Sequence, residues 1–391
     1  MAGDSQRIYE FYYNLYVGRR LPDAFESVCY RGREFRPGEG ENAPEVPGKA
    51  RIAKTALITH CPSYLDYTPN PRPAQSCKKL FRVRGFAMDL TGVDSAREYL
   101  GKYLNSGFRT SLRRRLRGLE NSLELRHEVF FGHLEDGVYL ELMRDMEQML
   151  TRRFNQRNEE HMSLSNWAYF KDRTLELVRE KKASISVIYD AEKPIQICLN
   201  YHLDSVVFLA IPAYDIDYSK YGLGIIGVYK VLEWGLRNGV TKIDMGFGAL
   251  DYKLRWCNTS YAFRHYLFYE KNSPASRFFA VKHILKTRVV VFLLDRKINL
   301  LWRRFRNLWR RKPPPELPAY RVTRITGQED RVAGRPQVYP FSDPDYAFLK
   351  HALLNFAYRE RVRRTAIRVF PTRREKEYLF DSGKNRILVC L

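Results

Sequence analysis

The amino-acid sequence predicts an α+β fold in which helices flank a mixed sheet, an antiparallel meander followed by one strand–helix–strand unit. Three strand-like segments at residues 184–190, 195–202 and 205–212 follow one another through tight turns, and such turns join antiparallel neighbours. Residues 225–236 then show helical periodicity and lead directly to a strand at residues 241–245. A strand, a helix and a strand with short links predict a parallel pair with a crossover helix.

Hydrophobic periodicity predicts the other elements of this body. Helices are expected at residues 94–104, 108–125, 137–157 and 166–181, and strands at residues 81–90 and 261–269. Near the end of the chain, a helix at residues 346–359 and a final strand at residues 386–391 are expected.

Composition shifts divide the chain into four segments. Residues 1–80 are rich in Gly, Pro and Tyr and predict an irregular region that packs on the core. Residues 81–276 form the predicted α+β body. Residues 277–312 form a basic amphipathic segment, and residues 313–391 form a small C-terminal unit.

Charge is the unusual property of the composition. The 391 residues contain 67 Lys and Arg against 44 Asp and Glu, a formal net charge of +23. Such a charge favours polyanionic partners, such as phospholipid headgroups, nucleic acids or phosphorylated cofactors. No apolar run has the length of a membrane span, and no signal peptide is readable. The six scattered Cys and eight His show no metal-ligand spacing. We therefore expect a cytoplasmic protein with reduced thiols and no metal.

The segment at residues 277–312 has two interpretations. It contains 12 Lys or Arg and one acidic residue, interleaved with aromatic and aliphatic side chains. An interfacial helix would bring its tryptophans to the headgroup region and its basic residues to anionic lipids. The alternative is a helix packed on its own body with a solvated basic face. The membrane interpretation, favoured here, assigns the contact to Trp302, Arg303, Arg304, Trp309 and Arg310.

Two motifs contain candidate binding or catalytic residues. Gly222-Leu223-Gly224 comes between a strand and the first turn of a helix, where free N–H groups and the helix dipole bind anions. The second motif is Ile243-Asp244-Met245-Gly246 followed by the run from Asp251 to Trp256. A carboxylate at Asp244 within a buried strand is either functional or ties down the adjacent loop. Lys253 and Arg255 follow this strand on the side where the cleft is expected, and a cation there stabilises an oxyanion or binds a phosphate.

These residues resemble the GNAT-fold acyltransferases of the FemAB and CelD-like group. The resemblance covers residues 81–269 and rests on the order of several motifs rather than on one. The motifs are Ala213-Tyr214-Asp215, Tyr218-Ser219-Lys220-Tyr221, Glu233-Trp234-Gly235, Asn238-Gly239, Ile243-Asp244-Met245-Gly246 and Tyr252-Lys253-Leu254-Arg255-Trp256. The arginine-rich helix from Arg109 to Arg117 is also similar to the start of the domain in that group.

The resemblance implies transfer of an acyl or aminoacyl group from an activated donor to an amine. GNAT enzymes bind the coenzyme A pyrophosphate on an Arg/Gln-x-x-Gly-x-Gly loop, and Gly222 and Gly224 match its glycines. Ser219 replaces the Arg or Gln, which keeps acyl carrier protein and aminoacyl-tRNA open as donors. The expected donor-binding residues are Ser219, Lys220, Tyr221, Gly222, Leu223 and Gly224.

Amide formation needs a deprotonated amine, a polarised carbonyl and a protonated leaving group. The resemblance implies that Lys253 stabilises the oxyanion, and a backbone N–H near residues 209–211 is a second candidate donor to the carbonyl. Asp244 or Asp251 is the candidate base, with His202 as a rival, and Tyr252 or Tyr229 is the candidate acid. The expected acceptor-binding residues are Tyr214, His202, Arg255 and Trp256.

Together these observations predict an N-acyltransferase with an acyl-CoA or acyl carrier protein donor. Its acceptor would be an amine of a lipid, saccharide or amino acid, at the cytoplasmic surface of the membrane. One alternative is an aminoacyl-tRNA-dependent transferase acting on a cell-wall precursor, since the positive charge also attracts tRNA. The other is a non-catalytic basic adaptor for membranes or nucleic acids that has kept a degenerate GNAT body.

Overall fold

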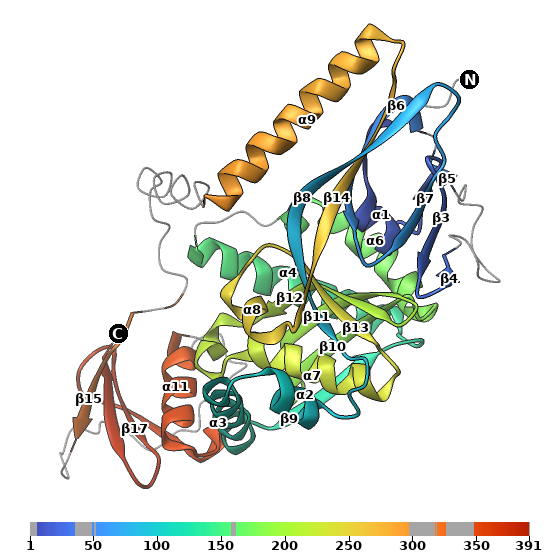
Figure 1. Cartoon of the computed structure of the whole chain (residues 1–391). Helices are drawn as coiled ribbons and strands as arrows, with labels where there is room; N and C mark the ends of the chain where they lie inside the picture. The colour runs from blue at the N-terminus through green and yellow to red at the C-terminus, as the bar shows by residue number, and fades with distance from the viewer. Residues whose placement is uncertain are drawn as a thin grey trace.

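The structure of the chain is a computed structural model, shown in Figure 1. It describes residues 6–35, 49–50, 52–157, 162–296, 317, 319–325 and 348–390.

Among these residues, nine strands form one mixed sheet, in the order β1-β6-β14-β8-β13-β12-β11-β10-β9. The strands are β1 (Gln6–Glu10), β6 (Ile52–Pro62), β8 (Gln75–Asp89), β9 (Leu125–Phe130), β10 (Ala183–Asp190), β11 (Lys193–Leu203), β12 (Val206–Tyr214), β13 (Lys242–Phe247) and β14 (Thr259–Glu270). The predicted meander β10-β11-β12 is antiparallel throughout. Strand β13 runs parallel to β12 after the crossover helix α7 (Leu223–Arg237). The predicted α+β class and strand order are therefore confirmed for this part of the sheet.

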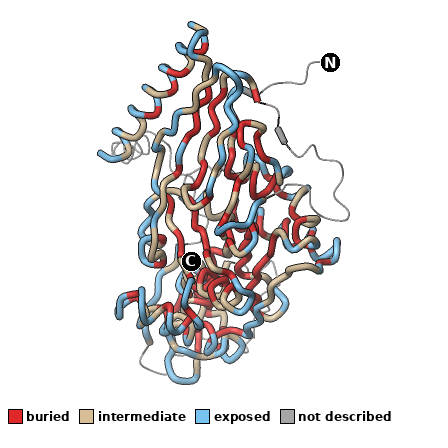
Figure 2. The backbone as a smooth tube through the Cα atoms, turned by 45° about the vertical axis from the view of Figure 1, so that its right-hand side comes forward, coloured by how far each residue is buried: buried red, intermediate tan, exposed pale blue. Residues whose placement is uncertain are grey.

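Helices cover both faces of the sheet. The helices are α1 (Phe11–Tyr16), α2 (Ala96–Tyr103), α3 (Ser106–Ser122), α4 (Asp136–Arg157), α5 (Met162–Ser165), α6 (Trp167–Arg179), α8 (Asp251–Trp256), α9 (Pro274–Asp295) and α11 (Lys350–Glu360). One core cluster takes its buried side chains from α1, α4 and α6, and a second takes them from α2, α3 and α7. In α3, for example, Leu112 and Leu119 are buried while Arg113 and Arg114 point to solvent, as its amphipathic sequence predicts. Figure 2 shows buried residues concentrated along the strands between these layers.

The described part of residues 1–80 is ordered structure, so the expectation of an irregular region is wrong. Strand β6 pairs antiparallel with β14, and β1 pairs parallel with β6, so both belong to the main sheet. Short strands add two small sheets beside them, namely β2 (Leu21–Pro22), β3 (Phe25–Tyr30), β4 (Arg33–Glu34), β5 (Lys49–Ala50) and β7 (Asp66–Pro69). Pro62 and Pro69 are the last residues of strands β6 and β7 rather than parts of a long loop. At the end of a strand, the missing N–H of proline does not interrupt the hydrogen bonds of the sheet.

The C-terminal residues form a smaller unit. Its described strands are ordered β15-β18-β17-β16 and pack against α11, so the helix and the final strand predicted near the end of the chain are present. The bounds are β15 (Arg321–Ile325), β16 (Arg368–Pro371), β17 (Glu377–Asp381) and β18 (Arg386–Cys390).

Helix α11 attaches this unit to the main body. The buried Lys350 Nζ donates to Asp215 Oδ2 at 2.6 Å and lies 3.0 Å from Asp217 Oδ2. The Tyr221 hydroxyl donates to the Leu354 carbonyl at 3.0 Å. Asp215, Asp217 and Tyr221 flank or belong to the 3-10 helix η1 (Ile216–Tyr221), which leads directly into α7. The C-terminal unit therefore supports the segment that precedes the Gly222 turn.

Helix α9 contains the first part of the predicted basic amphipathic segment. It runs along the outer edge of the molecule, against β8 and β14 (Figure 1). Trp302, Arg303, Arg304, Trp309 and Arg310 lie outside the described residues. No helix in the described ranges combines the length and apolarity that a membrane span requires.

Replacing Lys350 by Met should lower the free energy of unfolding by about 2 kcal/mol, because two buried carboxylates lose one of the two cations that they share and keep only Arg152. The exposed Lys384→Met serves as the control and should change it by less than about 0.5 kcal/mol. Urea denaturation measures both. Equal effects of the two substitutions would contradict a supporting role for the Lys350 contacts.

Candidate active site

Strands β12 and β13 part from each other near the middle of the sheet. Within these two fully described strands, Val206, Val207 and Phe208 pair with Lys242, Ile243 and Asp244, and the pairing ends there. Strand β12 continues to Tyr214 and β13 to Phe247. A register shift against β11 near Ala210 bends β12 as well. Backbone groups of β12 beyond Phe208 are thus left without a partner on β13.

A cavity of about 290 Å³ lies beside this opening. It is bounded by β12, by the turn into α7 and by the C-terminal part of α4. Six of its lining residues are among the predicted site residues, namely Tyr214, Ser219, Gly222, Leu223, Gly224 and Tyr252. The arrangement brings the glycine motif, the β12 edge and the Tyr-Lys segment to one place.

Arginines surround the glycine end of this cavity. Arg153 and Arg157 line it from α4, and the Arg115 guanidinium lies so close to Gly222 that a Cβ there would overlap it. Gly222 has φ of 72° and begins α7, whose first amides have no partner within the helix. Backbone donors and guanidinium groups are the types of group that bind phosphate anions. Sequence reasoning missed these three arginines, although the i, i+4 spacing of Arg153 and Arg157 places them on one helix face.

Lys253 lies near the end of β13 and is not among the residues that line this cavity. Its side chain is buried, and Nζ donates to the Phe247 carbonyl at 2.9 Å. Burial lowers the pKa of Lys253, and the nearby charge of Asp244 partly opposes this. The ammonium keeps two further N–H donors. A cationic donor is thus available beside the parted strands.

The neighbouring Tyr252 lines the smaller cavity. Burial raises the pKa of its hydroxyl to about 12, so the group stays protonated at neutral pH. A protonated phenol donates a proton or a hydrogen bond to a leaving group.

Asp244 is enclosed by hydroxyl groups. Its side chain is fully buried, and it accepts hydrogen bonds from Tyr12 and Tyr64 at 2.6 Å each and from Tyr261 at 2.5 Å. The Gly246 amide donates a fourth bond at 2.8 Å. Burial raises the pKa of Asp244, while these four donors favour its ionised form. With its acceptor sites occupied, the carboxylate ties down the turn after β13, the structural alternative stated above for this residue.

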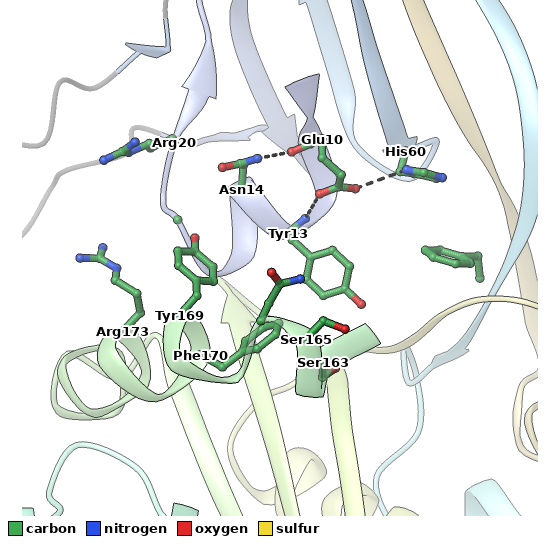
Figure 3. Close-up of a pocket in the computed structure, with 13 residues that line it drawn as sticks. Glu10, Tyr13, Asn14, Arg20, His60, Ser163, Ser165, Tyr169, Phe170 and Arg173 are labelled. Carbon is green, nitrogen blue, oxygen red and sulfur yellow. Dashed lines mark hydrogen bonds and ion pairs between the residues drawn. The ribbon is translucent and has the colours of Figure 1, made fainter. Parts of the chain in front are cut away.

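A second, larger cavity of about 720 Å³ lies beyond the end of β13 (Figure 3). Residues of α1, β6, α5 and α6 line it together with Phe247. The His60 ring stacks on Phe247 at 5.3 Å between centroids, and Nδ1 lies 3.4 Å from Glu10 Oε1. Because the Phe247 carbonyl binds Lys253, this residue connects the larger cavity to the opening between the strands.

Comparison with known proteins finds one family model that matches part of the chain. Residues 106–254 match the family described as an acetyltransferase (GNAT) domain. This segment is therefore similar to GNAT acetyltransferase domains. The match includes the meander, the crossover helix and Lys253 and confirms the predicted fold and enzyme class. No curated protein matches the chain.

The solved structures that resemble this chain are distant in sequence. FemX is 9% identical with a TM-score of 0.42, over 59% of this chain and 75% of its own. L-PGS from Bacillus licheniformis is 15% identical with a TM-score of 0.36, over 60% of this chain and 73% of its own. A conserved protein of unknown function from Bacteroides thetaiotaomicron is 9% identical, with a TM-score of 0.36 and 49% of this chain covered. The present chain covers 62% of that protein's length.

Several other predicted site residues lie away from both cavities. Trp256 is fully buried against Phe108, and Tyr221 is buried in the same core. Lys220, Asp251 and Arg255 are exposed and line neither cavity. Roles for these five residues in binding or proton transfer receive no support from their positions.

The positions of His202 and Tyr214 correct two further expectations. His202 is buried, its Nε2 lies 2.8 Å from Ser184 Oγ, and burial lowers its pKa to about 3. It is a structural residue rather than a base. Tyr214 lies in the smaller cavity, beneath the Arg153 guanidinium at 4.4 Å, and therefore on the donor side rather than the acceptor side. Among the described residues, no group of His, Cys, Asp and Glu is arranged to bind a metal.

Replacing Asp244 by Asn should lower the free energy of unfolding by about 3 kcal/mol. The amide brings a buried donor against hydroxyl donors and removes the charge that strengthens their bonds. Asp251→Asn is the matched control at an exposed position and should change stability by less than about 0.5 kcal/mol. Chemical denaturation gives both values. An Asp244→Asn variant as stable as this control would show that the tyrosine contacts contribute little.

Proposed function

We propose that the protein transfers an acyl group from a thioester donor to a primary amine. The observation that carries this proposal is the parting of β12 and β13 beside a cavity lined by the glycine motif and two arginines, with Lys253 bound to the last residue of β13. A thioester on a phosphopantetheine arm fits such a site, because its phosphates and its carbonyl need positive partners at two separate points. The family match supports acyl transfer as the class of reaction.

Different residues contribute to the successive steps of acyl transfer. The thioester carbonyl accepts hydrogen bonds from the β12 edge near Ala210 and from the Lys253 ammonium, which stabilise the oxyanion formed on attack. The amine nitrogen forms a bond to the carbonyl carbon and loses a proton. The C–S bond then breaks, and Tyr252 protonates the leaving thiolate. Glu10 and His60, on the Phe247 side, are the groups placed to take the amine proton.

Coenzyme A or acyl carrier protein is the proposed donor carrier. Ser219 lacks the charge that GNAT enzymes place at this position, but Arg115, Arg153 and Arg157 bring positive charge to the same end of the cavity. The positive charge that Ser219 does not supply is therefore available from α3 and α4. Inhibition of transfer by ribonuclease would instead identify an aminoacyl-tRNA donor.

We also propose that the enzyme acts at an anionic membrane surface. The outer face of α9 exposes Phe278 at 74%, Val281 at 62% and Leu285 at 60%, and Val289 and Phe292 continue the same stripe. The opposite face packs on the sheet through Ala280 and Phe279. Arg277, Lys282, Lys286 and Arg288 accompany the exposed stripe along the helix. Apolar side chains flanked by basic ones match the requirements of a lipid headgroup region.

The Arg153→Ala substitution should weaken coenzyme A binding about tenfold, because one charge-assisted contact to the phosphates is lost. Arg144→Ala, at an exposed position on the same helix, is the control and should bind as the unmodified protein does. Isothermal titration calorimetry measures the affinities. Equal affinities for all three proteins would exclude Arg153 from the donor site.

Lys253→Met should lower kcat about 100-fold without changing coenzyme A affinity, because the lost contact forms at the developing oxyanion. Since burial lowers the pKa of Lys253, activity of the unmodified enzyme should fall as pH rises through a value below the ordinary lysine pKa. Lys253→Arg should move this alkaline fall to higher pH. Steady-state pH profiles test the assignment, and an unchanged alkaline limb in Lys253→Arg would contradict it.

Membrane binding is tested by flotation of the full chain with anionic liposomes. The double substitution Phe278→Glu and Leu285→Glu should abolish flotation, because it places charge on the exposed stripe. Val138→Glu with Leu140→Glu, two exposed apolar positions on α4, is the control and should float normally. Undiminished flotation of the α9 variant would refute the proposed contact.

A further inference from the structure

We infer that the larger cavity binds an acceptor with an amine at one end and an anionic group at the other, and that a phosphorylated amino sugar is the class that fits. The inference rests on the proposed acyl transfer and adds the identity of the acceptor. It is argued from charges, hydrogen-bonding groups and aromatic side chains that line the cavity in separate regions (Figure 3).

The end of the cavity next to the reaction centre is acidic. Glu10 Oε2 accepts the Tyr13 amide at 2.8 Å, which fixes the carboxylate at the start of α1, and Oε1 lies 3.4 Å from His60. The His60 ring stacks on Phe247, whose carbonyl binds Lys253. An amine bound by Glu10 and His60 is therefore held at the end of the cavity that adjoins the oxyanion donor.

The other end of the cavity is basic. Figure 3 shows Arg20 and Arg173 together on one side, with Glu10 and His60 on the opposite side. Among the described residues Arg20 makes no ion pair, and Arg173 lies 3.6 Å from Glu176 on its own helix. Two guanidinium groups at the same wall suit a phosphate, which accepts several hydrogen bonds at once.

Hydroxyl, amide and aromatic groups line the space between these ends. Ser163, Ser165, Asn14 and Asn166 supply small donors and acceptors, and Tyr169 and Phe170 supply flat surfaces. A sugar ring presents hydroxyl groups at its edge and an apolar C–H face, so it matches both kinds of group. With about 720 Å³, the cavity has the size of small-molecule sites in proteins.

Much of this cavity comes from outside the family domain. Glu10, Asn14, Arg20 and His60 precede the matched residues 106–254. The N-terminal segment therefore supplies both the acidic end and one of the two guanidinium groups. Acceptor choice is a property of this added segment rather than of the shared GNAT body.

Calorimetry with the full chain and no acyl donor tests the inference. Glucosamine 6-phosphate is the probe, glucose 6-phosphate lacks the amine, and glucosamine lacks the phosphate. Each of the two incomplete compounds should bind at least about tenfold more weakly than the probe, because one charged end is unpaired. Equal affinity of all three compounds, or no binding of the probe, would overturn the inference.

Substitutions assign each end of the ligand. Glu10→Gln keeps an acceptor for the Tyr13 amide and should remove the preference for the amine. Arg20→Ala with Arg173→Ala should remove the preference for the phosphate. Glu141→Gln and Arg97→Ala, both exposed and outside the cavity, are the controls. Unfolding midpoints equal to that of the unmodified protein establish that each variant is folded, and unchanged preferences in folded variants would overturn the assignment.

Coenzyme A binding, measured on the same samples, separates this inference from the proposed function. A protein that binds coenzyme A but not glucosamine 6-phosphate would refute the acceptor class and leave the proposed function standing. A protein that binds the amino sugar phosphate with the expected preferences but no thioester donor would support the acceptor site and refute the proposed donor.

Discussion

The buried carboxylate of Asp244 is the constraint on which the rest of the active site depends. An unpaired charge at this depth would be strongly destabilising, and three hydroxyls from α1, the turn after β6 and β14 satisfy it together with the Gly246 amide. These bonds attach the N-terminal segment to the end of β13. They also hold the end of β13, whose last residue Phe247 accepts a hydrogen bond from Lys253 and lines the larger cavity.

The parts of the fold that depend on neighbouring segments were predictable from the sequence. The meander and the crossover helix follow from tight turns and helical periodicity between residues 184 and 245. The N-terminal strands were not predictable in this way, because β6 pairs with β14, about 200 residues further along the chain. As long as that partner strand is unknown, the irregular alternation of apolar and polar residues in β6 and the prolines that flank it suggest loops. The tyrosines near the N-terminus were the remaining signal, and their role appears only when Asp244 is seen beside them.

The site likewise contains residues that local sequence motifs predict and residues that only the folded chain brings together. Gly222, Gly224 and Tyr252 belong to local motifs and line one cavity, and Lys253, from the same motif as Tyr252, binds the last residue of β13. The larger cavity could not be predicted, since its walls come from α1, β6, α6 and the end of β13, which meet only in the folded chain. Trp256 and His202 were predicted to bind the acceptor because their residue types suit binding. Both are instead buried side chains that contribute to packing.

The most direct test of this account is a crystal structure of the protein with a non-hydrolysable acyl thioether of coenzyme A. The account predicts that the pyrophosphate lies over the turn at Gly222 and that the acyl carbonyl oxygen lies about 3 Å from Lys253 Nζ, between β12 and β13. Density for the analogue elsewhere on the molecule, with the space between the two strands empty and Lys253 still bonded only to Phe247, would contradict it.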